Sequence, residues 1–86
     1  MQSNKKEMIC KALAKIVKKL RGKRSQFMLA SENDISISII STIERGLKDP
    51  QLTTIFKLAE MFNMNADDFI KLIRKELPKN FSLIEK

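Results

Sequence analysis

Apolar residues recur every three or four positions along most of this 86-residue chain. Leu13, Val17 and Leu20 form the first such stripe, and lysines fill the positions on the other side. This spacing places side chains on one face of an α-helix. Gly22 stands where such a helix would end. The pattern therefore predicts an amphipathic first helix over about residues 5–21.

The same spacing and a set of capping residues predict three more helices. Ser25 suits the N-cap of a short second helix, which should stop at positions 33–34 because Asn and Asp tolerate a left-handed turn. Residues 52–63 carry an apolar stripe that predicts another helix. Asn65 can cap a last helix, which Pro78 cannot continue.

The isoleucine-rich stretch ISISII decides the fold class. Residues 35–39 alternate apolar and polar side chains, which is typical of a β-strand. However, Ser36 is a good N-cap, apolar side chains from Ile40 onward follow the helical spacing, and Gly46 suits a helix end. A strand would also lack a partner, since no second strand-like run is evident. We therefore predict a helix over about residues 37–45 and an all-α fold.

A chain of this length is enough for one domain with one modest core. We expect residues 1–78 to form that domain and residues 79–86 to form a C-terminal tail. The tail keeps the apolar residues Phe81, Leu83 and Ile84, although it is too short to form a core of its own. It either folds back over the same chain or helps the fifth helix meet a second subunit.

Charge favours a polyanionic partner. The formal net charge is +7, and residues 1–24 carry nine Lys or Arg against one acid, Glu7. Nucleic acid and an anionic membrane surface would both attract such a chain. The membrane surface fits less well, because the apolar side of the first helix is needed to hold the third helix. No run is long enough to span a bilayer, and we expect a cytoplasmic protein with no membrane partner.

Composition argues against an enzyme. The chain has no His and one Cys, so the usual metal-ligand and proton-shuttle sets cannot be assembled. No pair of acids or nucleophile–base arrangement is evident either. We expect no catalysis, no cofactor, no metal and no small-molecule ligand.

Two short helices joined by a tight turn, with a basic helix before them and two helices after, match the layout of a helix-turn-helix DNA reader. The supporting motifs are Ser-Gln at 25–26, Leu-Ala at 29–30, Ile-Ser at 35–36, Ile-Glu-Arg-Gly at 43–46 and Asp-Pro at 49–50. This pattern resembles the Cro and phage-repressor-like, or XRE, family over about residues 12–73. The resemblance implies a compact five-helix, lambda-repressor-like DNA-binding domain.

The resemblance also implies a role for each matching position. The helix over residues 37–45 would lie in the major groove and read bases with four side chains: Ile37, Ser38, Ser41 and Thr42. The residues expected at phosphates before and after that helix are Ser25, Gln26, Ser36, Arg45 and Lys48, together with the basic link Lys23 and Arg24. Arg21 and Glu44 would form an ion pair with a structural role.

The sequence departs from the family pattern at the turn and on the reading face. Asn33 and Asp34 stand where the family usually has an apolar residue and Gly, and the link between Arg21 and Ser25 is about two residues shorter than usual. The reading face lacks the Arg, Gln and Asn side chains that make bidentate base contacts. Ile37 offers an apolar contact to a thymine methyl, and specificity should rest partly on DNA shape and on basic arms such as Lys23 and Arg24.

These observations predict a sequence-specific transcriptional regulator, repressor-like in action. It would bind double-stranded DNA at a palindromic operator as a homodimer formed through the fifth helix and the tail. The resemblance implies a bacterial or phage-encoded protein that is nucleoid-associated when bound. The alternative is a protein-interaction module that keeps the helix-turn-helix scaffold and docks a partner through Ile37 and Ile39.

Overall fold

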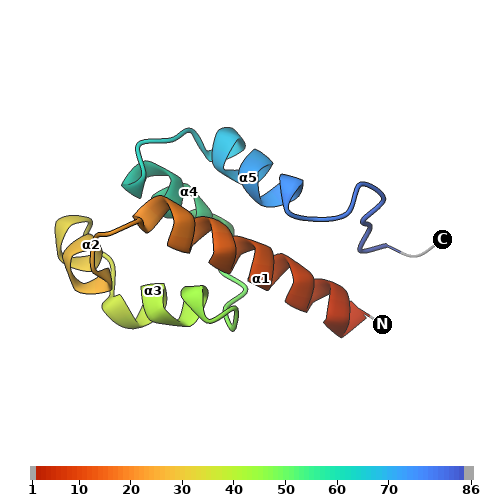
Figure 1. Cartoon of the computed structure of the whole chain (residues 1–86), viewed down its shortest axis with the longest axis horizontal. Coiled ribbons are helices and arrows are strands. Elements are labelled where there is room, and N and C mark those ends of the chain that lie inside the picture. Colours follow the sequence, from red (N-terminus) through yellow and green to blue (C-terminus); the bar gives the residue numbers. More distant parts are fainter. Residues whose placement is uncertain (1, 85–86) are drawn as a thin grey trace.

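The computed structural model describes residues 2–84, so residue 1 of the predicted domain and residues 85–86 of the predicted tail lie outside the described residues. Within that range the chain forms five helices and no strand. They are α1 (Gln2–Arg21), α2 (Gln26–Glu32), α3 (Ile37–Glu44), α4 (Leu52–Met61) and α5 (Ala66–Lys75) (Figure 1). The predicted all-α, five-helix fold is confirmed, and the strand alternative for residues 35–39 is wrong.

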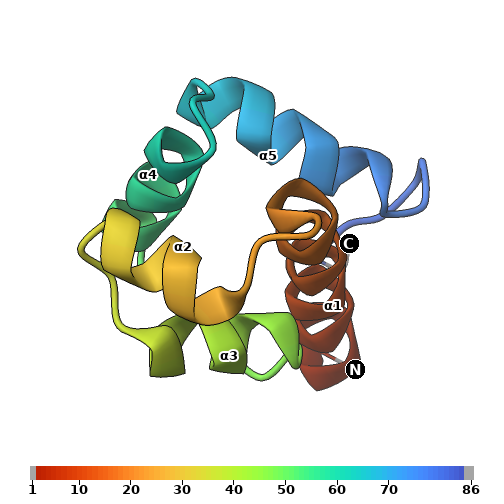
Figure 2. The ribbon, with the colours of Figure 1, turned by 60° about the vertical axis from the view of Figure 1, so that its left-hand side comes forward.

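The long helix α1 joins the two halves of the molecule. It packs against α3 and against α5, while α2 packs against α3 and α4 against α5. Figure 2 shows α3 along the lower edge of the molecule and α5 along the upper edge, with the end of α3 meeting α1. The outward side of α3 is therefore left uncovered by the other helices.

One core connects all five helices. The largest fully buried side chains are Val17 of α1, Leu29 of α2, Ile40 and Ile43 of α3, Leu58 of α4 and Phe69 of α5. Burying an apolar side chain of this size stabilises a fold by about 1.5–3 kcal/mol. Each helix therefore contributes at least one such residue to its own anchoring.

The turn between α2 and α3 follows from its residues. Asp34 has a φ of 52°, which is the left-handed conformation that Asn and Asp tolerate. The side-chain amide of Asn33 donates to the carbonyl of Leu29 at 2.8 Å, which satisfies the end of α2. Ser36 then caps α3 by accepting from the backbone N–H of Ser38 at 3.1 Å. The Asn-Asp pair thus forms the turn in place of the apolar residue and glycine expected in the family.

Helix ends differ from the predicted ones by a few residues. Helix α1 begins at Gln2 rather than near residue 5, because no helix-breaking residue interrupts its first turn and extension of a formed helix is favourable. Asn65 occupies the N-cap of α5 but makes no side-chain cap hydrogen bond. Asp67 and Asp68 lie in that first turn, where their charge complements the positive end of the helix.

Candidate nucleic-acid interface

The outward side of α3 carries the four side chains predicted to read bases. Ile40 and Ile43 point into the core, so the other sides of the helix remain accessible. Ile37 is 44% exposed and Ser38 is exposed, whereas Ser41 and Thr42 are half-buried. This surface is small and uncharged.

Hydrogen bonds within α3 already occupy most hydroxyl groups on this side. The Oγ atoms of Ser36 and Ser38 lie 2.7 Å apart and share a hydrogen bond. The Oγ1 of Thr42 donates to the carbonyl of Ser38 at 2.7 Å, so its methyl group and its oxygen lone pairs remain for other contacts. The Ser41 hydroxyl has no hydrogen-bond partner within residues 2–84 and stays available as donor and acceptor.

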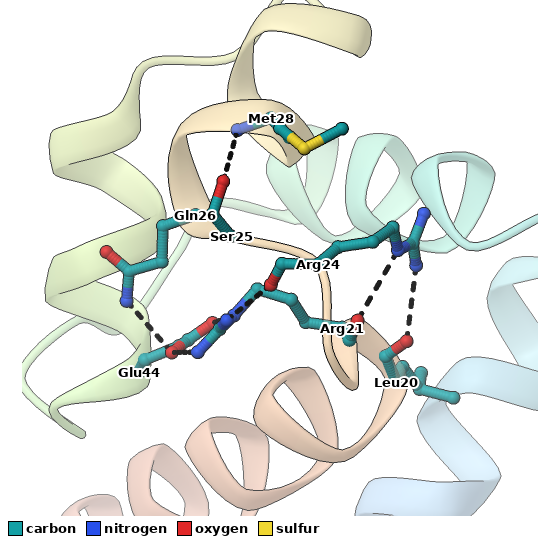
Figure 3. Close-up of polar contacts among 7 residues, drawn as sticks. All are labelled: Leu20, Arg21, Arg24, Ser25, Gln26, Met28 and Glu44. Atoms are coloured by element: carbon teal, nitrogen blue, oxygen red, sulfur yellow. Dashed lines mark hydrogen bonds and ion pairs between the residues drawn. The ribbon is translucent and has the colours of Figure 1, made fainter.

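A buried carboxylate ties α3 to the two helices before it. Arg21 donates to both oxygens of Glu44, from Nε to Oε2 at 2.6 Å and from Nη2 to Oε1 at 2.8 Å. Gln26 donates from Nε2 to the same Oε1 at 2.9 Å (Figure 3). Glu44 is only 4% exposed, so these bonds replace the water that the carboxylate lost. The cluster, which we call the Glu44 clamp, joins α1, α2 and α3.

The Glu44 clamp keeps its acid charged. Burial raises the pKa of Glu44, but the hydrogen bonds from Arg21 and Gln26 and the nearby positive charges lower it more, and the net pKa lies below its ordinary value. The hydrogen bond to Glu44 in turn raises the pKa of Arg21. Both partners are therefore ionised at neutral pH, and a bidentate geometry of this kind fixes orientation as well as charge.

Comparison with protein families decides the identity of this arrangement. A family model described as helix-turn-helix matches residues 15–69, which is well over half of the chain. The matched range starts inside α1 and ends inside α5, so it includes the α2–turn–α3 unit and the Glu44 clamp. The chain belongs to the Cro and phage-repressor-like helix-turn-helix family. No curated protein and no solved structure matches it significantly.

In this helix-turn-helix regulator, two residues predicted at phosphates also hold the fold together. Gln26 uses one N–H of its amide for Glu44. Arg24 donates to the carbonyls of Leu20 at 3.2 Å and Arg21 at 3.4 Å, and its guanidinium lies 5.9 Å from the ring centre of Phe62. Arg24 therefore covers the end of α1 instead of extending as a free arm. The sequence carried no signal for the contacts of Gln26 with Glu44 and of Arg24 with Phe62, because they depend on how the helices cross.

The other predicted phosphate residues lie before α2, at the start of α3 and after α3. Ser25 and Ser36 are exposed N-caps whose oxygens accept from the backbone of Met28 and Ser38. The remaining three, all exposed and without an ion pair in the described part of the chain, are Lys23, Arg45 and Lys48. Positively charged side chains thus lie before and after the helix-turn-helix unit along the chain.

The structure corrects the premise of the protein-docking alternative. Ile37 and Ile39 were expected to form an exposed pair. Ile39 is half-buried and packs against the core, so the expectation is wrong for this residue. Two residues apart on a helix, the side chains point about 160° apart and cannot share one docking face.

Residues 2–84 contain neither a membrane-spanning helix nor a cluster of metal ligands. None of the helices there combines the length and hydropathy needed to cross a membrane. Nor do three or more His, Cys, Asp or Glu side chains in that range gather where they could hold a metal ion.

Proposed function

We propose that the chain is a sequence-specific, repressor-like regulator of transcription that binds a palindromic operator as a homodimer. The observation that carries this proposal is the outward side of α3, which no other helix covers and which holds small, uncharged side chains. The core and the Glu44 clamp hold this helix rigidly. A rigid helix of this kind fits the major groove of B-DNA.

Base reading falls to four side chains of α3, namely Ile37, Ser38, Ser41 and Thr42. The free hydroxyl of Ser41 can donate to or accept from a base edge, and the methyl groups of Ile37 and Thr42 suit the methyl of thymine. Ser and Thr discriminate less sharply than Arg or Asn, so DNA shape supplies part of the specificity. Arg45, Lys48 and Lys23 contribute sequence-independent affinity through phosphates, as do the caps Ser25 and Ser36 and the remaining polar groups of Gln26 and Arg24.

The homodimer forms through α5 and the tail. Ile70 of α5 is 45% exposed and lines an apolar hollow of about 280 Å³ together with Ile9 of α1 and Leu77 after α5. The tail returns toward the first half of α1, where Leu83 lies near Ile9 and Lys6, while Ile84 remains largely exposed. A second copy would cover this apolar surface and would place two α3 helices in a symmetric pair.

Selection of duplexes from a random pool tests the proposal. The expected product is a palindromic consensus whose half-sites are about one helical turn, or a multiple of it, apart. Selection that yields no consensus, with all duplexes bound equally at one ionic strength, would contradict it. An asymmetric consensus would contradict the homodimer while leaving DNA reading intact.

A further inference from the structure

A second basic surface lies on α1, outside the residues matched to phosphate positions. Lys11, Lys15 and Lys18 follow one another at four and three residues, so they share one face of the helix, and all three are exposed. The Nζ of Lys15 lies 3.0 Å from Oε1 of Glu76 and is neutralised there. Lys11 and Lys18 form no ion pair with any residue that the structure describes.

This lysine face meets the end of the reading helix. Lys11, Lys15 and Lys18 line a shallow hollow of about 290 Å³ together with Ala14, Glu44, Arg45 and Gly46. Gly46 has a φ of 73°, and a Cβ added to it would lie 3.3 Å from Cγ of Lys11. The absence of that side chain lets the turn after α3 lie against α1. Arg45 and the lysines are thereby held on one continuous surface.

The acid in this hollow does not cancel the positive charge. Glu44 is buried, and both of its oxygens already accept hydrogen bonds from Arg21 or Gln26. Its charge is compensated by a partner that belongs to the fold. Lys18 is one of the nearby positive charges that lower the pKa of Glu44, but it forms no ion pair with that carboxylate. Lys11 and Arg45 likewise form no ion pair in the described part of the chain.

We propose that Lys11 and Lys18, together with Arg45, bind the phosphates of the DNA strand that flanks the groove occupied by α3. The inference rests on the proposed function and adds two contact residues on α1. Lys11 and Lys18 are seven residues apart, which is about 10 Å along a helix. Each DNA strand carries one phosphate per about 3.4 Å of duplex axis, so a helix segment of this length placed along that axis would span about three phosphates of one strand.

DNA fits this surface better than a membrane does. A helix that lies on a membrane needs a continuous apolar side turned to the lipid. The apolar side of α1 is buried instead, with Leu13, Ile16 and Val17 inside the core. The lysine face is also continuous with Arg45, which ends the helix that reads bases.

The double variant K11Q/K18Q tests the assignment, because glutamine keeps most of the aliphatic stem and removes the charge. Binding to a selected and to a random duplex is measured by fluorescence anisotropy between about 50 and 200 mM salt, for the wild type and the variant. Each phosphate contact adds about 0.9 to the slope of log affinity against log salt. The variant should lose about 2 from that slope, so the wild type should lose about tenfold more affinity than the variant over this range. The change should be equal for the two duplexes.

Two controls accompany this measurement. Lys57 is exposed on α4, which packs against α5, and K57Q should keep the wild-type slope. The variant K11R/K18R restores the charge and should restore the slope. An unchanged slope in K11Q/K18Q, or a loss of slope confined to the selected duplex, would overturn this inference and leave the proposed function standing. A wild-type chain that binds neither duplex would overturn the proposed function as well.

Discussion

Glu44 shows how one residue can serve both the stability of the fold and the placement of α3. Its carboxylate is buried at the end of α3, and its hydrogen bonds come from α1 and α2. A charge buried in this way is costly unless every acceptor is satisfied. Because these hydrogen bonds satisfy the carboxylate, it fixes the angle at which α3 leaves the core. The direction in which the outward side chains of α3 point depends on that angle.

Removal of Arg21 should therefore destabilise the chain strongly. Arg21→Ala leaves the charge of Glu44 buried with one partner fewer, and loss of one member of a buried pair costs about 3–5 kcal/mol. Because the Arg21 side chain is 22% exposed, we expect the lower end of that range. Urea denaturation, followed by circular dichroism, measures this loss as a change in the free energy of unfolding. Lys19→Ala, an exposed neighbour on α1, should change stability by less than about 0.5 kcal/mol. Equal stability of the two variants would contradict a structural role for the ion pair.

The same carboxylate should make stability depend on pH. The pKa of Glu44 is lower in the folded chain than in the unfolded one, so its contribution is complete above the unfolded value of about 4.3. It is lost as the pH falls through the lowered folded pKa, where the unfolded state binds the proton first. Glu44→Gln has no such proton to bind, so its stability should fall less between neutral pH and acid. If the stability of the wild type and of Glu44→Gln changed in parallel with pH, Glu44 would not be the source of the pH dependence.

Ile37 should contribute specificity more than stability. The side chain is 44% exposed, so Ile37→Ala should alter the free energy of unfolding by no more than about 0.5 kcal/mol. If Ile37 contacts a thymine methyl, replacing that thymine by uracil should weaken binding of the wild type about five- to tenfold, a loss of about 1 kcal/mol. The variant should not distinguish thymine from uracil. Discrimination retained by Ile37→Ala would remove this residue from the reading set.

At the scale of the elements, α3 and α5 present the two uncovered sides that the proposal uses. Helix α5 buries Phe69 and Ile73 in the core and leaves Ile70 on the outside, beside an apolar hollow. The proposed subunit contact rests on the hollow and the apolar residues around it, because contiguous exposed apolar surface marks interaction sites.

Ile70→Asp should convert the proposed dimer into a monomer without unfolding the chain. The substitution places a charge at the centre of the proposed subunit contact, whereas in the monomer the side chain already reaches water. Sedimentation equilibrium measures the mass. Lys71→Asp, an exposed neighbour outside the hollow, should keep the wild-type mass. The account of the dimer would be wrong if the wild type itself were monomeric, or if Ile70→Asp kept the dimer.

The sequence predicted these elements because their spacing and caps are local properties. Ser25 and Ser36 start helices, and Asp34 turns the chain, for reasons that lie within a few residues. Contacts between helices cannot be predicted from local spacing, and only the pair of Arg21 and Glu44 was expected, from the family resemblance. The hydrogen bond from Gln26 to Glu44 and the lysine face beside Gly46 depend on crossing angles, which no local pattern encodes. Burial of Ile39 depends on the same angles.

At the scale of the whole molecule, function follows from a division of labour around one core. All five helices anchor side chains in it, and the Glu44 clamp joins the first three. Most of the positive charge lies on α1 and in the link after it, and Arg45, at the end of α3, lies beside the lysines of α1. Along the chain, the uncharged side of α3 comes between the link and the cations Arg45 and Lys48. Charge would then supply affinity that falls with salt, while α3 supplies the preference for one sequence.

The ratio of two affinities tests this account most directly. Dissociation constants for a selected duplex and for a random duplex of equal length are measured at one salt concentration near 150 mM. Specific readers bind their sites typically 10³-fold or more tightly than other DNA, and a ratio of about that size is the predicted result. A ratio near one would mean that the outward side of α3 does not read bases, and it would contradict the central claim.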